Sequence, residues 1–206
     1  MEDLLRRKPV ELDTAKIEAY IRNRRVMVTG AGGSIGSEIV RQISRFNPES
    51  IILLGRGENS IYHIVREMKS DFRKIPIHIK IADVRDISTM EKIFEEIHPE
   101  VIFHAAAHKH VPLMESNPSQ AVFNNIGGTR NLVNLALEHD VKYFVNISTD
   151  KAVNPTSVMG ASKRIAEYLV EEASHKASDD QIFVSVRFGN VLGSRGSVIP
   201  VFRDQI

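Results

Sequence analysis

The sequence predicts a doubly wound α/β fold, in which helices cover both faces of a parallel sheet. Three observations support this prediction: short apolar runs recur along the chain, stretches with helical spacing separate them, and a glycine-rich turn follows the first run. Strands that alternate with helices of about 10 to 15 residues form βαβ units, which build parallel sheets. In such sheets ligands bind outside the carboxyl ends of the strands, so residues that carry chemistry should follow the strands.

The composition is that of an ordinary globular chain. Of 206 residues, 42% are hydrophobic and 26% are charged, and a net charge of +1 gives no reason to expect nucleic-acid binding. The chain has no cysteines, which excludes disulfides and fits a reducing compartment. No apolar run reaches the roughly 18 residues of a membrane span, and the N-terminus lacks a signal-peptide core. We therefore expect a soluble, cytoplasmic chain.

The elements can be placed in order. Residues 1–24 are polar and helix-prone, with basic clusters at both ends, and predict either a helix packed on the domain or a linker from another domain or a membrane surface. The first long helical pattern follows the glycine-rich turn, and another begins after a capping residue at Asp86 or Ser88. The predicted strands are 26–30, 51–54, 77–81, 101–107, 143–148 and 182–188.

The turn TGAGGSIG at 29–36 indicates a dinucleotide site. Its glycines, three residues apart, let the backbone turn tightly and bring amide groups at a helix N-terminus close to a pyrophosphate. The turn follows a strand, opens a helix and begins a βαβ unit, which is the context that the motif requires. An NAD(P)-binding Rossmann domain is therefore predicted at 25–206. The predicted cofactor residues in the turn are Gly30, Gly33, Ser34, Ile35 and Gly36.

Residues after the next strands favour NADP over NAD. Gly55 and Arg56 follow the second strand, where NAD enzymes usually have an acidic residue, and an arginine suits a 2′-phosphate. Alternatively, Arg56 is only solvated and Glu58 holds the ribose of NAD. Asp83 and Val84 follow the third strand, where Asp83 is placed to accept from the adenine amino group. Small side chains after the fourth strand allow close approach of the cofactor; they are Ala105, Ala106 and Ala107.

Several of these motifs resemble those of the extended short-chain dehydrogenase/reductases. The resemblance is carried by TGAGGSIG, ADV at 82–84, HAAA and the spacing of Met159 and Lys163. Those enzymes usually carry Tyr-x-x-x-Lys, and here Met159 occupies the tyrosine position.

Longer stretches are similar to the polysaccharide-biosynthesis subfamily of UDP-N-acetylglucosamine 4,6-dehydratases. They are HAAAHKHVPLMESNP at 104–118, STDKAVNPTSVMGASKR at 148–164 and RFGNVLGSRGSVIP at 187–200. The large membrane-anchored members of that subfamily are similar in having methionine at this position. MEDLLRRKPVELD also resembles the segment that joins their membrane part to the catalytic domain.

The resemblance implies a catalytic set at the end of the fifth strand. In the implied reaction, C4 of the sugar is oxidised, water leaves across C5 and C6, and hydride returns to C6. By resemblance, Thr149 relays the C4 hydroxyl proton, Asp150 protonates the leaving water, Lys151 removes the C5 proton and Lys163 binds the nicotinamide ribose. An adjacent Asp and Lys tend to stabilise each other's charged forms, which opposes both roles. Burial and the nearby cation Lys163 would therefore have to lower the pKa of Lys151, and burial would favour a neutral Asp150. A salt-bridged surface turn is the alternative.

Further polar residues are predicted to contact the substrate. Lys109 and His110 are placed to contact the sugar or a phosphate. Met159 is expected to fill space beside the sugar. Asn125 resembles an asparagine near the family's active site, with helix packing as the alternative, and Asn190 lies in a stretch that resembles the one near the UDP pyrophosphate. The histidines at 104, 108 and 110 invite a metal, but without a nearby carboxylate none is expected.

Two rival functions remain open from the sequence. A nucleotide-sugar epimerase has the same fold but usually needs the tyrosine, and a non-enzymatic dinucleotide-binding regulator would not need the retained Asp150, Lys151 and Lys163. The resemblance further implies a UDP-sugar substrate and a homo-oligomer. It also implies a chain that ends before the C-terminal substrate lobe, and a membrane part upstream that would hold the full-length protein on the cytoplasmic face of the inner membrane.

Overall fold

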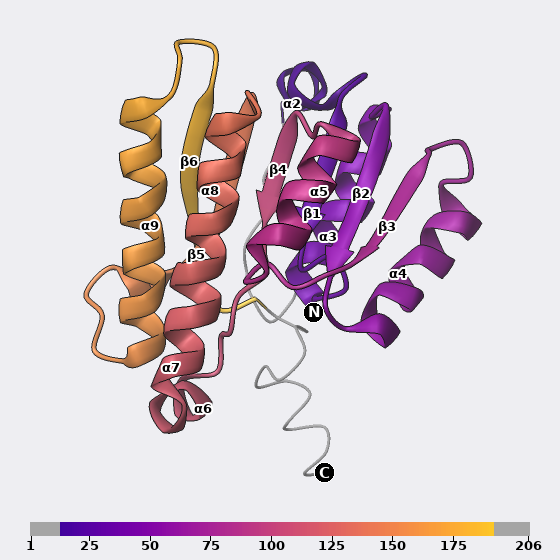
Figure 1. Cartoon of the computed structure of the whole chain (residues 1–206). Helices are drawn as coiled ribbons and strands as arrows, with labels where there is room; N and C mark the ends of the chain where they lie inside the picture. Colours follow the sequence, from indigo (N-terminus) through magenta and orange to yellow (C-terminus); the bar gives the residue numbers. More distant parts are fainter. Residues whose placement is uncertain (1–12, 192–206) are drawn as a thin grey trace.

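The computed structural model describes residues 13–191 of the chain. Within them, six parallel strands form one sheet in the order β3-β2-β1-β4-β5-β6, which is the predicted doubly wound fold (Figure 1). The strand order reverses between β1 and β4, the point at which this architecture forms its binding crevice.

The strands are β1 (Arg25–Thr29), β2 (Ser50–Gly55), β3 (Ile77–Ile81), β4 (Val101–His104), β5 (Tyr143–Thr149) and β6 (Ile182–Phe188). The α-helices are α2 (Thr14–Ile21), α3 (Ser34–Ile43), α4 (Glu58–Asp71), α5 (Ile87–Ile97), α6 (Val111–Ser116), α7 (Pro118–Ala121), α8 (Gly128–Glu138) and α9 (Val158–Lys176). Short 3₁₀ turns lie at η1 (Ser44–Phe46) and η3 (Asp150–Ala152), and η2 (Val122–Gly127) is a π-helix.

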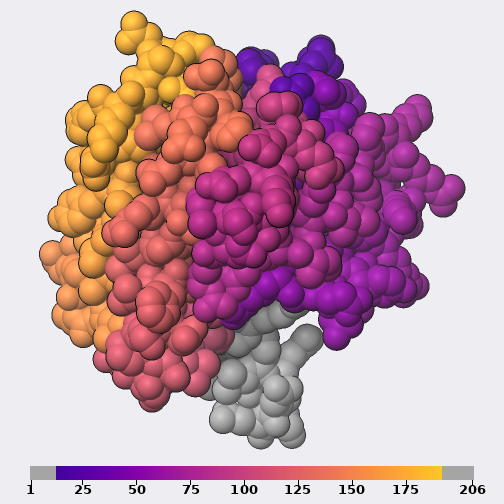
Figure 2. Space-filling model, viewed as in Figure 1, coloured from indigo at the N-terminus to yellow at the C-terminus, as the bar shows by residue number. Residues whose placement is uncertain are grey.

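Two hydrophobic clusters hold the helices to the two faces of the sheet. Successive strand residues point to opposite faces, so Met27 belongs to one cluster and Val28 to the other. The cluster around Val28 and Leu53 packs α3 and α4, and the cluster around Met27 and Phe144 packs α5, α8 and α9. Complete burial of a side chain such as Leu53 contributes roughly 1.5–3 kcal/mol. In the space-filling view, α5 and α8 conceal the sheet behind them (Figure 2).

Two predicted strand ends were wrong. The first strand ends at Thr29, because Gly30 adopts a φ of +67°, a left-handed conformation that turns the chain out of the sheet. The fourth strand ends at His104 and does not continue to 107. After Ala105 N–H donates to the Thr29 carbonyl, the chain leaves the sheet and runs along its edge. Residues 105–107 therefore line a groove and do not pair with a neighbouring strand of the sheet.

The described part of the N-terminal segment packs on the domain. Helix α2 begins where the Asp13 side chain accepts from Lys16 N–H, and it buries Ile21 in the cluster that contains Val28. The Tyr20 ring meets the Tyr143 ring edge-on at 5.0 Å. The basic cluster at 6–8 lies outside the described residues. Between residues 13 and 191, no helix combines the length and the apolar character needed to cross a membrane.

Candidate active site

One groove runs along the carboxyl edge of the sheet. It consists of a cavity of about 290 Å³ beside the glycine turn and a cavity of about 380 Å³ beside β5 and α9. Ala105, Ala107 and His108 line both cavities, so the segment after β4 is their common wall. We call the first the glycine cavity and the second the lysine cavity.

Most of the predicted site residues line this groove. In the glycine cavity they are Gly30, Gly33, Arg56, Asp83, Val84, Ala105, Ala106 and Ala107. In the lysine cavity they are Ile35, Lys109, His110, Thr149, Lys151, Met159, Lys163 and Asn190. Gly32, Ser60, His108 and Phe188 also line the groove, and the sequence analysis missed them. Gly32 stands inside the quoted motif, so the spacing of the motif could have included it.

Close packing explains the glycines of the turn. A Cβ on Gly36 would lie 2.1 Å from the Gly30 carbonyl oxygen, and a Cβ on Gly30 would lie 2.7 Å from the Ala105 carbonyl oxygen. Gly36 therefore lies buried behind the turn and serves its shape. Gly33 is the N-cap of α3 and brings no side chain to the helix terminus. The turn thus exposes backbone at the positive end of a helix dipole, which favours an anion.

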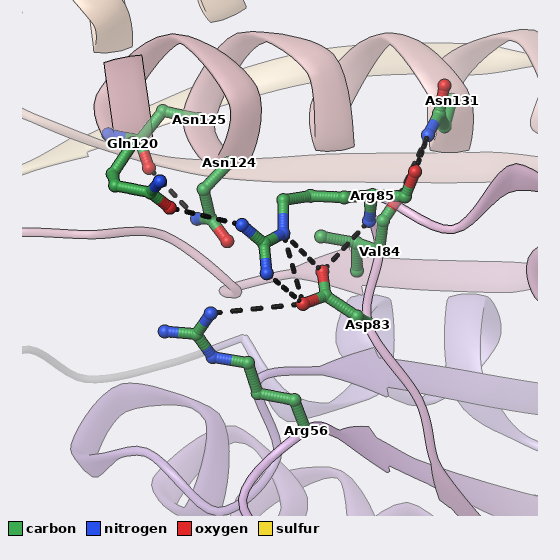
Figure 3. A network of polar contacts seen from close by, with 8 residues as sticks. All are labelled: Arg56, Asp83, Val84, Arg85, Gln120, Asn124, Asn125 and Asn131. Atoms are coloured by element: carbon green, nitrogen blue, oxygen red, sulfur yellow. Dashed lines mark hydrogen bonds and ion pairs between the residues drawn. The ribbon is translucent and has the colours of Figure 1, made fainter. Parts of the chain in front are cut away.

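Arginines surround Asp83 at the rim of the glycine cavity (Figure 3). Arg85 donates to the carboxylate through Nε and Nη2 and also to Gln120, and the Arg56 guanidinium lies 3.8 Å from the same carboxylate. The hydrogen bonds from Arg85 hold the pKa of Asp83 below its usual value, against the effect of burial. Both Asp83 oxygens are therefore already engaged by arginine, which the predicted contact with adenine did not anticipate.

The exposed end of β5 carries an ion pair. Lys151 Nζ lies 3.1 Å from Asp150 Oδ1, which also accepts from Thr149 Oγ1 at 2.9 Å, and Lys151 Nζ donates to Asn190 Oδ1 at 3.3 Å. Hydrogen bonds from Lys151 and Thr149 lower the pKa of Asp150. The Asp150 and Lys151 side chains are 55% and 42% exposed. The expectation that burial keeps Asp150 neutral and helps Lys151 to act as a base was therefore wrong for this arrangement.

Lys163 has the opposite environment. It is 4% exposed and donates from Nζ to the Ile147 carbonyl at 2.7 Å. Burial lowers its pKa to about 8, while the negative charge of Glu167 acts in the opposite direction. Of the three lysines that line the lysine cavity, Lys151 is exposed and ion-paired, whereas Lys163 is buried.

Met159, near the start of α9, packs against α6. It is 3% exposed and forms a small cluster with Met114 and Ala121. The Glu115 carboxylate accepts from Val158 N–H at 2.7 Å and adds a second tie between α6 and the start of α9. Met159 lines the lysine cavity, as expected, but it also anchors the helix that follows Lys109 and His110.

Asn125 lies behind the groove and not in it. It is 1% exposed, accepts from His108 N–H at 2.8 Å, and donates to the His108 carbonyl at 3.1 Å and to Ser162 Oγ at 2.9 Å. The prediction that Asn125 contacts the substrate was wrong, because these partners bury its side-chain amide. The alternative prediction, a role in packing the helix, agrees with the structure. The π-helix η2, a distortion that often marks functional sites, presents this residue.

The buried His104 has a structural environment. Thr29 Oγ1 lies 2.7 Å from its Nδ1 and Thr129 Oγ1 lies 3.0 Å from its Nε2. Burial, followed by the charge of Lys163, lowers its pKa to about 3, so it is neutral. Across residues 13–191, no group of three His, Asp or Glu side chains is arranged to hold a metal ion.

The strand order, the glycine turn and a lysine four residues after the usual tyrosine position define the short-chain dehydrogenase/reductase class. The family model described as "Polysaccharide biosynthesis protein" matches residues 26–206, and the chain belongs to this family. The resemblance seen in the sequence is confirmed.

Relatives and a solved structure agree with this assignment. The chain is 56% identical over 207 residues to "Capsular polysaccharide biosynthesis protein CapD" of Staphylococcus aureus, a match that covers 100% of this chain and 34% of the relative. It is 36% identical over 185 residues to a "UDP-N-acetylglucosamine 4,6-dehydratase (inverting)" of Campylobacter jejuni, covering 89% and 54%. The X-ray structure of Pen from Bacillus thuringiensis superposes with a TM-score of 0.83 at 37% identity, covering 91% and 56%. The chain thus spans about a third to just over half of these proteins.

Proposed function

We propose that the chain binds a nicotinamide dinucleotide and a UDP-sugar and carries the catalytic groups of a nucleotide-sugar 4,6-dehydratase in surface polysaccharide biosynthesis. The observation that carries the proposal is the single groove that joins the glycine turn to Thr149, Lys151 and Lys163, with Asp150 hydrogen-bonded to Thr149 and Lys151. The name of the 36% identical relative supports UDP-N-acetylglucosamine as the substrate.

The residues of the groove fit a dinucleotide. The glycine turn offers backbone amides to a pyrophosphate, and the alanines after β4 leave room beside it. Lys163 lies in the other cavity, where its ammonium can hold the nicotinamide ribose. When bound, the dinucleotide supplies the hydride acceptor and donor that the reaction needs.

Arg56 and Arg85 support NADP as the preferred dinucleotide. Both lie near Asp83 at the rim of the glycine cavity, and together they give this rim an excess of positive charge. Arg56 is half exposed, at 52%, and its contact with Asp83 is long. Its guanidinium can therefore turn from Asp83 to a 2′-phosphate at small cost. We expect Arg56→Gln to weaken NADP binding by about tenfold and NAD binding by less than about twofold, as measured by calorimetry. Equal losses for both dinucleotides would contradict the assignment of this arginine.

The Asp150–Lys151 ion pair supports a closed proton cycle. At rest the hydrogen bond from Lys151 lowers the pKa of Asp150 and favours its ionised form, which is the reverse of what an acid requires. A bound sugar excludes water and favours the neutral pair, so one proton passes from Lys151 Nζ to Asp150 Oδ1. Lys151 then takes the C5 proton, and Asp150 gives its proton to the departing C6 hydroxyl. The elimination returns both groups to the ion pair. When hydride returns to C6, Lys151 gives a proton back to C5 and is then reprotonated from solvent.

Thr149 and Met159 complete this assignment. Thr149 Oγ1 donates to Asp150 at 2.9 Å. Because Asp150 already holds the proton from Lys151, Thr149 relays the C4 hydroxyl proton to solvent, which later reprotonates Lys151. Met159 cannot exchange a proton, and its apolar side chain helps to exclude water from the cavity that it lines. Activity without the usual tyrosine therefore rests on the groups at the end of β5.

The test is turnover of UDP-N-acetylglucosamine by the chain in deuterated water, followed by NMR. We expect a 4-keto-6-deoxy sugar with deuterium at C5. Dinucleotide binding with an unchanged sugar would reject the proposed dehydratase for this substrate. A C4 epimer without loss of water would indicate an epimerase.

A further inference from the structure

Glu167 is a buried carboxylate that the proposed reaction does not use. It lies on α9, one helical turn after Lys163, and is 6% exposed. Ser148 Oγ donates to it at 2.6 Å, Arg164 Nη1 at 2.9 Å, and Arg187 donates through Nε at 2.9 Å and Nη2 at 2.7 Å. Burial alone would raise its pKa, but these donors lower the pKa to about 2. The carboxylate is therefore ionised and fully engaged across the physiological range.

The partners of Glu167 come from three of the elements that build the lysine cavity. Ser148 immediately precedes Thr149 on β5, and Arg187 lies on β6 three residues before Asn190. Arg187 approaches with two parallel N–H bonds, which fix direction as well as distance. One carboxylate thus joins β5, α9 and β6 just behind the residues that face the cavity.

Glu167 also acts on the charge of Lys163. Its negative charge raises the pKa of Lys163, which burial has lowered to about 8. Near Lys163, His104 on β4 is neutral. The other charged or titratable groups that line the same cavity are His108, Lys109 and His110 after β4 and Lys151 after β5. In this surrounding, Glu167 is the group that favours the ammonium form of Lys163.

We propose that Glu167 is a positioning residue of the site, which holds Thr149, Lys163 and Asn190 in one arrangement and keeps Lys163 charged for the dinucleotide. This inference rests on the proposed function, because the ammonium is assigned to dinucleotide binding. A salt bridge that only stabilises the fold would affect unfolding but neither the charge of Lys163 nor the pH dependence of binding.

The experiment compares the chain with its Glu167→Gln and Glu171→Gln variants. Glu171 lies one turn further along α9 and is exposed, so its variant is a control for the same loss of charge. Lys163 is titrated by NMR with labelled lysine, and NADP and NAD affinities are measured at pH 6.5 and pH 9. For Glu167→Gln we expect a lower Lys163 pKa and a loss of affinity that is about threefold to tenfold greater at pH 9 than at pH 6.5. Glu171→Gln should match the unmodified chain.

Two results would overturn the proposal. One is a Glu167→Gln variant in which Lys163 titrates as before. The other is a loss of affinity that is equal at both pH values. If the unmodified chain binds no dinucleotide, the proposed function fails, and the Lys163 titration still decides the electrostatic role of Glu167.

A second variant covers the case in which Glu167→Gln does not fold. Arg187→Lys keeps the charge on β6 but cannot make the two parallel bonds. We expect it to weaken dinucleotide binding about twofold to fivefold while the titration of Lys163 stays nearly unchanged. Affinity equal to that of the unmodified chain would reject the positioning role of the Glu167–Arg187 contact.

Discussion

The two cavities of the groove are built by different means. In the glycine cavity the backbone sets the geometry. Neighbouring backbone lies so close to Gly30 and Gly36 that neither position has space for a Cβ atom. In the lysine cavity the environment of each side chain decides its chemistry, since Lys151 is exposed and ion-paired while Lys163 is buried. Identical side chains thus serve different purposes in one cavity. The comparison teaches that the backbone of the turn sets the shape of the glycine cavity. The chemistry of each lysine, in contrast, depends on how deeply the surrounding fold buries it.

The largest expected effect comes from removing the exposed lysine. Lys151→Ala should lower kcat by about 10²- to 10⁴-fold, the range for loss of a general base. Stability should change little, because the side chain lies at the surface. Turnover of UDP-N-acetylglucosamine and thermal unfolding are measured together. An active Lys151→Ala variant would move the base to another residue and break the distinction between the two lysines.

Breaking the glycine cavity should have the next largest effect. A Cβ on Gly36 meets the Gly30 carbonyl oxygen, so Gly36→Ala must displace the turn, at a cost of about 1–3 kcal/mol. Dinucleotide affinity should fall by about 10- to 100-fold. The control is Gly127→Ala, since a Cβ there would lie 3.8 Å from its nearest neighbour, an ordinary contact. A similar loss of dinucleotide affinity in both variants would show that the close packing of Gly36 is not what binding requires.

Lys163 should make stability depend on pH. Its pKa is about 8 in the folded chain and about 10.4 in an unfolded one, so the unfolded chain binds more protons between these values. Burial of Lys163 therefore costs stability at neutral pH, by about 3 kcal/mol at most, and this cost is relieved as the pH rises from about 8 to about 10.4. Lys163→Met should be more stable at pH 7 by about 1–3 kcal/mol and should bind dinucleotide more weakly.

Urea unfolding of both proteins at pH 7 and pH 10 measures this effect. The difference in stability between the two should shrink at the higher pH. A Lys163→Met variant that is less stable at pH 7 would show that the hydrogen bond to Ile147 outweighs the cost of burial.

The smallest effect is expected at Met159. Leucine has a similar volume, so Met159→Leu should cost less than about 1.5 kcal/mol and should keep turnover within about threefold. The measurement is turnover beside thermal unfolding. A large loss of turnover without loss of stability would assign a chemical role to the thioether.

The sequence predicted the fold and the positions of the site residues because both depend on local patterns. Apolar runs and glycine spacing report backbone geometry, and the rule for strand ends brings Arg56, Thr149 and Lys151 to one edge. The protonation expected for Asp150 was wrong, and the place of Asn125 was wrong, because burial depends on elements distant in sequence. Glu167 was missed for the same reason, since Arg187 is 20 residues away in sequence.

The hydrogen bonds of Asn125 have a consequence for the wall between the cavities. A side-chain amide that binds both the N–H and the carbonyl of His108 satisfies both backbone groups of that residue, as a neighbouring strand would. Asn125 thus gives strand-like hydrogen bonds to His108, which lies four residues beyond the end of β4. The wall between the two cavities is consequently held at His108 by two side-chain hydrogen bonds to η2 and not by a neighbouring strand.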